Sequence, residues 1–154
     1  MGVLKAGAKA PDFTFRAQDG TTLSLQDFRG SKLVLYFYPK DDTPGCTAEA
    51  CNLRDNFQIM KEKGFKILGV SADSEVSHEK FIAKYVLPFA LIPDKEKTIL
   101  KAYGAWGKKK LYGKEYEGII RTTFVIDENG IIEKVFTKVD TKNHSQQILG
   151  EMGL

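Results

Sequence analysis

At 154 residues the chain is long enough to bury a core and short enough for one compact domain, so we expect a single domain over residues 1–154. Its 23 basic and 20 acidic residues are spread along the whole sequence, which disfavours nucleic acid or a membrane as a partner. Two cysteines are too few for a disulfide-stapled scaffold. The first ten residues lack the apolar block of a signal peptide, so a cytoplasmic location is expected.

The predicted elements alternate between strands and helices through the first two thirds of the chain. Strands are predicted where apolar residues are continuous or alternate with polar ones, and helices where apolar residues recur at three- and four-residue steps. In chain order these are a hairpin formed by 13–15 and 22–25, a strand over 33–38, a helix over 46–63, a strand over 65–71, a helix over 77–85, a strand over 89–92 and a short helix over 98–103.

The last third departs from this alternation. Residues 104–117, rich in Gly, Lys and Tyr, are expected to form a loop with weak extended pieces. Strands over 122–127 and 131–136 flank a strong hairpin turn signal, and a terminal helix is predicted over 144–152. This order predicts an α/β fold, a thioredoxin-like domain whose mixed central sheet has helices on both faces and an N-terminal β-hairpin extension.

The segment from Tyr38 to Cys51 carries the residues best suited to chemistry. A buried strand ends at Pro39, a turn-rich loop follows, and Cys46 opens a predicted helix. A thiol in the first helical turn lies among unpaired backbone N–H groups at the positive end of the helix dipole. Both features favour the thiolate, which is the nucleophilic form of cysteine.

Cys51 lies five residues after Cys46. In an intact helix this spacing separates the two Cα atoms by roughly 8–9 Å, with the side chains about 140° apart. A disulfide requires a Cα–Cα distance of no more than about 7 Å. If these two cysteines bond, the first one or two turns of the helix must therefore unwind.

Two plainer interpretations of the cysteines remain open. Both could be small core residues, which suits Cys51 better than Cys46, because Cys46 follows a Pro-Gly turn at a helix start. A zinc site is less favoured, since two cysteines five apart lack the usual gap of two to four residues. His78 and His144 show no paired ligand spacing, and we expect both on exposed helix surfaces.

This segment resembles the peroxiredoxins, whose hallmark Pro-x-x-x-Thr/Ser-x-x-Cys is matched here from Pro39 to Cys46. The longer string Tyr-Phe-Tyr-Pro-Lys-Asp-Asp-Thr-Pro-Gly-Cys-Thr-x-Glu-x-Cys is similar to the Q-type branch, also called the bacterioferritin comigratory protein family. That branch commonly places a resolving cysteine five residues after the peroxidatic one. Residues 10–13, 69–73 and 118–127 also resemble family segments, so the resemblance covers nearly the whole chain.

The resemblance implies a thiol peroxidase with no cofactor and no metal. Cys46 would attack hydrogen peroxide or an organic hydroperoxide and become a sulfenic acid. Cys51 would convert it to an intramolecular disulfide, which thioredoxin or a similar dithiol would reduce. Thr43 would direct its hydroxyl at the thiolate and the peroxide, and Arg121 would stabilise the charge that develops as the O–O bond breaks.

Lesser roles are implied for three neighbouring residues. Pro39 would shield the pocket from water, and the backbone N–H groups of Gly45 and Cys46 would complete the set of donors. Glu49 would join the hydrogen bonds of the site, although an acid in the first helical turn is favourable in any case. The family's commoner state, a monomer, is expected here.

Two other functions fit parts of the sequence. A disulfide oxidoreductase of thioredoxin type usually carries Cys-x-x-Cys and often a cis-proline before the late strand, where this chain has Arg121. A redox-sensing or chaperone-like binding protein would need a partner surface, and no large apolar patch is evident in the sequence. Lys108-Lys109-Lys110 is expected to be a solvated loop, with docking of a reductase as the alternative.

Overall fold

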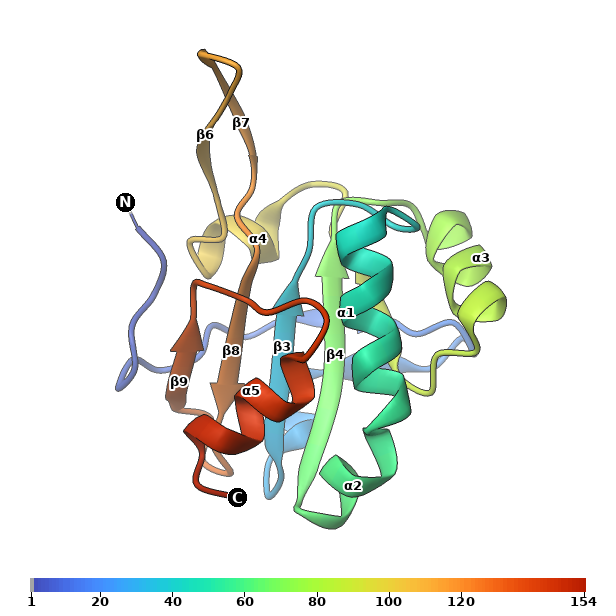
Figure 1. Ribbon diagram of the computed structural model, residues 1–154. Helices are drawn as coiled ribbons and strands as arrows, with labels where there is room; N and C mark the ends of the chain where they lie inside the picture. Colours follow the sequence, from blue (N-terminus) through green and yellow to red (C-terminus); the bar gives the residue numbers. More distant parts are fainter. Residues whose placement is uncertain (1) are drawn as a thin grey trace.

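A mixed five-stranded sheet with the strand order β5-β4-β3-β8-β9 forms the centre of the computed structural model, which describes residues 2–154 (Figure 1). Its strands are β3 (Lys32–Phe37), β4 (Phe65–Ser71), β5 (Ala90–Pro93), β8 (Thr122–Ile126) and β9 (Ile132–Phe136). Strands β3, β4 and β5 run parallel, whereas β8 pairs antiparallel with both β3 and β9. The predicted mixed sheet is confirmed.

The remaining elements lie outside this sheet, and most of them cover its two faces. They are β1 (Thr14–Arg16), β2 (Thr22–Ser24), the 3-10 helix η1 (Leu25–Phe28), α1 (Pro44–Asp55), α2 (Phe57–Glu62), α3 (Glu75–Tyr85), α4 (Thr98–Ala102), β6 (Trp106–Leu111), β7 (Lys114–Ile119) and α5 (His144–Glu151). Core residues of α1, α2, α3 and α5 pack on one face, and those of β1, η1 and α4 on the other. This is the predicted thioredoxin-like arrangement with an N-terminal hairpin.

Strand β3 supplies both halves of the core because it is buried on both faces. Val34 and Tyr36 point toward the face covered by α1, and Leu33 and Leu35 point toward the opposite face. Such a strand has no polar side to alternate with, which is why it appears in the sequence as one continuous apolar run. The chain then leaves the sheet at Pro39 and returns as α1.

The helix predicted over 46–63 is interrupted in the structure. It begins two residues earlier, at Pro44, where a proline is tolerated because the first N–H of a helix has no partner. It breaks at Asn56, whose side-chain Nδ2 donates to the carbonyl oxygen of Asn52 at 2.9 Å. A side chain that bonds to nearby backbone in this way competes with the helical ladder.

The segment expected to be a loop over 104–117 is a hairpin of β6 and β7 that projects from the body of the protein (Figure 1). Its turn residues Tyr112 and Gly113 have φ angles of 52° and 77°. Two consecutive positive φ angles define the tight hairpin turn that usually carries Asn-Gly or Asp-Gly. A tyrosine in the first position concealed this turn in the sequence.

Within residues 2–154, none of the helices has both the length and the apolar composition needed to cross a membrane.

Candidate active site

Cys46 lies at the start of α1, next to the end of β3. Its side chain is 1% exposed and belongs to the apolar cluster on the α1 face of the sheet. The sulfur is not isolated there, because Nη2 of Arg121 donates a hydrogen bond to Cys46 Sγ at 3.2 Å. A positive group and the first turn of a helix therefore both act on this sulfur.

The sheet register explains why Arg121 reaches this point. In the antiparallel pair of β3 and β8, Phe37 lies opposite Thr122, so Arg121 stands just beyond the end of β3. That is also where the loop leading to Cys46 begins. A Cβ atom at Gly45 would lie 3.2 Å from Arg121 Nη2, so glycine leaves room for the guanidinium.

Arg121 is held by a second contact on the opposite side of its guanidinium. Its Nη1 donates to Oε1 of Glu49 at 2.6 Å, one helical turn after Cys46. Burial lowers the pKa of Arg121, but the negative charges of Glu49 and Cys46 outweigh burial and leave the pKa above its ordinary value. The planar fork of arginine thus bridges a carboxylate and a sulfur.

Glu49 is fully buried behind Arg121. Burial raises its pKa to about 7, and the opposing charge and hydrogen bond of Arg121 only partly offset this effect. Its second oxygen, Oε2, has no hydrogen-bond partner among the residues that the structure describes. Since no face of this carboxylate is exposed, its position suits holding Arg121 better than contacting a substrate.

The nearest polar group to that free oxygen is His144, at the start of α5. Its Nε2 lies 3.6 Å from Glu49 Oε2 and 2.8 Å from the hydroxyl oxygen of Thr123. His144 Nδ1 donates to Oε1 of Gln147 at 2.9 Å, which leaves Nε2 of the neutral ring to accept from Thr123. Burial lowers the pKa of His144 to about 4. The expectation that His144 is exposed was wrong, because α5 packs its first turn against α1.

Thr43 and Pro39 lie in the loop before α1. The hydroxyl of Thr43 donates to the carbonyl oxygen of Lys40 at 2.8 Å rather than to Cys46. The carbonyl oxygen of Thr43 accepts from the N–H of Thr47 at 2.8 Å and so closes the first helical turn. Both Thr43 and Pro39 are half-buried, at the edge of the site.

Cys51 lies in the second turn of α1, partly exposed, and both cysteines are free thiols. The next residue, Asn52, ties this part of α1 to α5. Its Oδ1 accepts from the backbone N–H of Ser145 at 2.7 Å, and its Nδ2 donates to the carbonyl oxygen of Lys142 at 3.0 Å. The intact helix therefore keeps the two sulfurs apart and is fastened just after Cys51.

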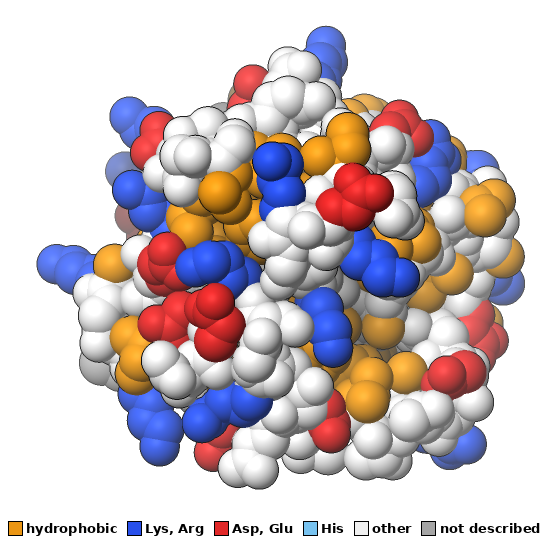
Figure 2. All heavy atoms as spheres, turned by 90° about the horizontal axis from the view of Figure 1, so that it is seen from below, with side chains coloured by type: hydrophobic (Ala, Val, Ile, Leu, Met, Phe, Trp, Pro, Cys, Tyr) orange, Lys and Arg blue, Asp and Glu red, His pale blue; other side chains and the backbone are white. Residues whose placement is uncertain are grey.

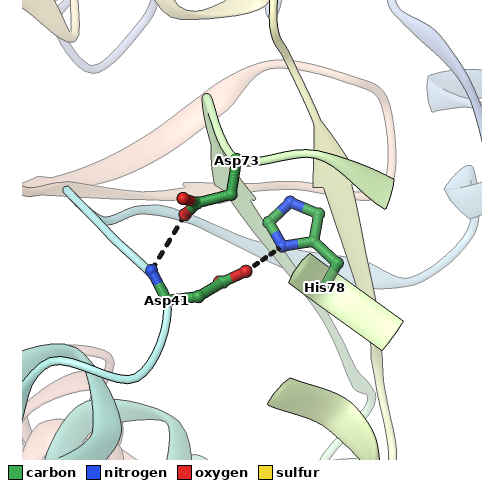
Figure 3. A group of neighbouring side chains, drawn as sticks. All are labelled: Asp41, Asp73 and His78. Atoms are coloured by element: carbon green, nitrogen blue, oxygen red, sulfur yellow. Dashed lines mark hydrogen bonds and ion pairs between the residues drawn. The ribbon is translucent and has the colours of Figure 1, made fainter. Parts of the chain in front are cut away.

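A buried polar cluster braces the loop that precedes Cys46 (Figure 3). Asp41 Oδ2 lies 2.8 Å from Nδ1 of His78, while its backbone N–H donates to Asp73 Oδ2 at 2.8 Å. Burial raises the pKa of Asp41, but hydrogen bonds from His78 and Tyr38 outweigh it and hold the pKa below its ordinary value. The expectation that His78 is exposed was also wrong.

The geometry of this cluster resembles a metal site, since one ligand atom from each of Asp41, Asp73 and His78 lies within 4.8 Å of the others. Each of these atoms already has a protein partner. Asp73 Oδ2 also accepts from the Ser71 hydroxyl at 2.7 Å, and the other ring nitrogen of His78 faces the carbonyl oxygen of Ile92 at 3.1 Å. The cluster is therefore explained as a brace between the loop, β4 and α3.

An apolar hollow of about 350 Å³ lies at the other end of the sheet. Four phenylalanines contribute to its lining, namely Phe28, Phe57, Phe65 and Phe89. Figure 2 views the molecule from that end and shows apolar side chains interspersed with basic and acidic ones. Because β4 begins there whereas Cys46 follows the end of the parallel strand β3, the hollow is separate from the cysteine site.

The structure thus brings together four of the residues predicted to form the site, namely Cys46, Gly45, Glu49 and Arg121. It leaves the Thr43 hydroxyl turned away and Cys51 beyond reach of Cys46. Sequence reasoning missed the buried partners His144 and Thr123, for which the sequence carried no signal. Asp41 was within the recognised motif, and its acidic character next to a turn was the only hint of the brace.

A thioredoxin-like fold with a thiol at a helix start beneath an arginine defines the class of cysteine-based peroxidases. The comparisons with known proteins agree, because the AhpC/TSA family pattern matches residues 6–135. A putative peroxiredoxin Bcp of Coxiella burnetii is 47% identical over 97% of this chain and 99% of its own length. Peroxiredoxin Bcp of Escherichia coli K12 is 44% identical over 97% of this chain and 96% of its own length.

Solved structures give the same result. A cysteine-to-serine mutant of the Xylella fastidiosa peroxiredoxin Q superposes with a TM-score of 0.91 at 29% identity, covering 99% of this chain and 98% of that one. The bacterioferritin comigratory protein of Xanthomonas campestris, described for its alkyl peroxide reduction activity, gives 0.85 at 35% identity over 92% and 90% of the two chains. The chain belongs to the AhpC/TSA family, and within it to the Bcp or Q-type peroxiredoxins.

Proposed function

We propose that this chain reduces hydrogen peroxide and organic hydroperoxides with Cys46 as the nucleophile and thioredoxin as the final electron donor. The observation that carries the proposal is the 3.2 Å contact between Arg121 Nη2 and Cys46 Sγ at the first turn of α1. The described activity of the Xanthomonas campestris relative supports organic hydroperoxides as substrates.

In the first step the Cys46 thiolate attacks the terminal oxygen of the hydroperoxide. An S–O bond forms, the O–O bond breaks, and the departing oxygen takes up a proton to give water or an alcohol. Arg121 donates to the oxygens between which charge moves, and the unpaired N–H groups of Gly45 and Cys46 add donors there. The Thr43 hydroxyl would exchange its bond to Lys40 for one to the peroxide.

Two residues support this first step without touching the sulfur. Glu49 holds the guanidinium of Arg121 in place through its 2.6 Å hydrogen bond, which keeps one edge of the guanidinium turned toward Cys46. Pro39 stands at the half-buried edge of the site, where its ring limits the access of water to the sulfenic acid.

In the second step Cys51 attacks the sulfur of the sulfenic acid, releasing water and forming a disulfide. The helical separation of roughly 8–9 Å between Cα atoms must first close, so the start of α1 unwinds. The Arg121–Glu49 ion pair spans this segment and is lost in the process. Thioredoxin then reduces the disulfide by thiol–disulfide exchange, and α1 re-forms.

The setting of the reaction follows from the same chemistry. We place the protein in the cytoplasm because the proposed cycle starts from two thiols and that compartment keeps thiols reduced. We infer that residues 1–154 act as one unit, since the residues proposed for the site come from α1, from the loop before it and from the position just before β8, all at one end of a single sheet. We also propose that this unit acts as a monomer.

The test is a thioredoxin-coupled peroxidase assay on the wild type, Cys46→Ser and Cys51→Ser. Loss of the Cys46 thiol should abolish activity with every reductant, because no other nucleophile lies at the helix start. Loss of Cys51 should preserve one rapid oxidation per chain and prevent recycling by thioredoxin. Peroxidase activity in Cys46→Ser would remove Cys46 as the nucleophile, and full recycling of Cys51→Ser would remove Cys51 as the resolving thiol.

The same assay separates the proposal from a disulfide oxidoreductase. Stoichiometric hydrogen peroxide oxidises the thiol of a peroxidase rapidly, whereas it oxidises a dithiol reductase no faster than a free thiol. Trp106 fluorescence and thiol titration report this oxidation.

A further inference from the structure

The hairpin of β6 and β7 projects beside the proposed active site. Its base is closed by a hydrogen bond from the N–H of Ile120 to the carbonyl oxygen of Ala105 at 2.7 Å. The next residue is Arg121, which contacts Cys46. Figure 1 shows the hairpin extending past the end of the sheet at which α1 begins. A protein that approaches the start of α1 from the side of β8 therefore meets this hairpin.

One face of the hairpin carries cations and carboxylates on opposite strands. The register places Lys108 opposite Glu117 and Lys110 opposite Glu115. Trp106 Nε1 also donates to Glu117 at 3.0 Å, and Lys110 Nζ lies 4.0 Å from Glu115. The register therefore sets each cation on this face opposite a carboxylate, so opposite charges balance across the strand pair.

The opposite face is composed differently. Because side chains alternate along a strand, it carries Lys109 and Leu111 from β6, with Lys114 and Tyr116 directly across from them on β7. Lys109 Nζ donates to the carbonyl oxygen of Ile119 at 2.8 Å, and neither Lys109 nor Lys114 forms an ion pair among residues 2–154. This face combines apolar groups with two cations and has no carboxylate. We call it the basic face.

The tip of the hairpin adds an aromatic ring that is almost fully exposed. Tyr112 is 96% exposed and sits at a φ of 52°, a conformation that a bulky residue rarely adopts. Leu111 beside it is 55% exposed. Exposed tyrosines and leucines on a projecting element are typical of a surface that binds another protein.

We propose that the basic face, with Tyr112 at its tip, is the docking surface for the protein that reduces the Cys46–Cys51 disulfide. This inference rests on the proposed function, which requires such a dithiol protein to reach α1. The partner's matching surface is an apolar patch bordered by aspartate or glutamate, which complements Leu111, Tyr112 and Tyr116 together with Lys109 and Lys114. A small dithiol has no such surface and gains nothing from the hairpin.

The test compares thioredoxin with dithiothreitol as the reductant of the same variants. The double variant Leu111→Thr/Tyr112→Gly removes the exposed apolar groups while keeping residues that suit a strand and a left-handed turn. Lys114→Glu reverses one charge of the basic face. The matched control is Val86→Gly, because Val86 is 76% exposed and also has a φ of 52°, but lies at the end of α3.

We expect the two hairpin variants to raise the KM for thioredoxin by about tenfold, which corresponds to losing one well-packed anchor residue. The rate of oxidation by hydrogen peroxide and turnover with dithiothreitol should match the wild type, as should all measurements on the control. Circular dichroism verifies that each variant is folded. An unchanged KM in the hairpin variants, or an equal change in Val86→Gly, would refute the docking surface.

Failure of this inference can be told apart from failure of the proposed function. If the wild type turns over peroxide with neither reductant, the peroxidase proposal itself is wrong. If it turns over with thioredoxin and the hairpin variants leave the thioredoxin KM unchanged, only the docking surface is wrong. If it turns over with dithiothreitol but not with thioredoxin, the docking surface and the choice of thioredoxin as electron donor are both wrong, while the peroxidase chemistry stands. The other possible occupant of this surface is a second copy of the chain. Analytical ultracentrifugation tests it: if the molecular mass of the double variant were half that of the wild type, the hairpin would be assigned to a dimer interface, which would also refute the docking surface.

Discussion

Replacing Glu49 with glutamine should change how the stability of the fold depends on pH. The glutamine has the same shape, and its Oε1 can keep the hydrogen bond from Arg121 Nη1. Its amide nitrogen would take the place of Oε2, which has no hydrogen-bond partner among the residues that the structure describes, so no existing hydrogen bond is lost. The variant should therefore fold, and it removes one buried ionisable group.

The direction of this change follows from whether the folded or the unfolded protein binds more protons. Burial raises the pKa of Glu49 from 4.5 to about 7, so between these values the folded protein holds a proton that the unfolded chain has lost. Raising the pH through this window therefore destabilises the wild type, and glutamine abolishes that loss. The free energy of unfolding of Glu49→Gln should gain roughly 3 kcal/mol relative to wild type between pH 4.5 and pH 7.

His144→Gln is the matched variant, for which the change in stability with pH should have the opposite sign. Burial lowers the pKa of His144 from 6.5 to about 4, so in this window the unfolded chain holds the extra proton. The wild type therefore gains stability from His144 as the pH rises, and the variant should lose roughly 3 kcal/mol relative to wild type between pH 4 and pH 6.5.

The assay is urea unfolding of the reduced proteins, followed by far-ultraviolet circular dichroism at half-unit steps from pH 4 to pH 8. The informative quantity is the difference in the free energy of unfolding between variant and wild type, because the contributions of the carboxylates that all three proteins share cancel. Curves that stay parallel to the wild type over the whole range, or two variants that change in the same direction, would refute the buried charge assignments.

Two further changes test the groups around Cys46. Arg121→Lys keeps a positive charge but cannot bridge Glu49 and Cys46 at once. The rate at which peroxide oxidises the protein, followed by stopped-flow fluorescence, should therefore fall about 100-fold. A loss below about threefold would contradict the donor role. Asn52→Ala removes the side-chain hydrogen bonds from α1 to α5, while the bond from the Ser145 hydroxyl to the carbonyl oxygen of residue 52 remains. Unwinding should be easier and disulfide formation about fivefold faster by rapid acid quench, with Gln58→Ala as an exposed control. A slower or unchanged rate in Asn52→Ala would show that unwinding stops before residue 52.

Local sequence patterns were enough to predict most of the helices and strands. The strand over 33–38 appears as a continuous apolar run because both its faces are buried, and the helix after Cys46 shows its three- and four-residue spacing. Such signals depend on residues a few positions apart, so they survive without knowledge of the fold. They failed at Asn56, where a side chain interrupts the helix, and at Tyr112, where a bulky residue occupies a turn position normally held by Asn or Gly.

The sequence by itself thus established the fold class, the thiol at a helix start and the resemblance that identified the family. Only the tertiary structure decided what surrounds that thiol, because the decisive partners are far apart along the chain. The register of β3 against β8 brings Arg121 to Cys46, and the packing of α5 on α1 buries His144 beside Glu49. Contacts of this kind depend on how whole elements pack, and no periodicity within either segment encodes them.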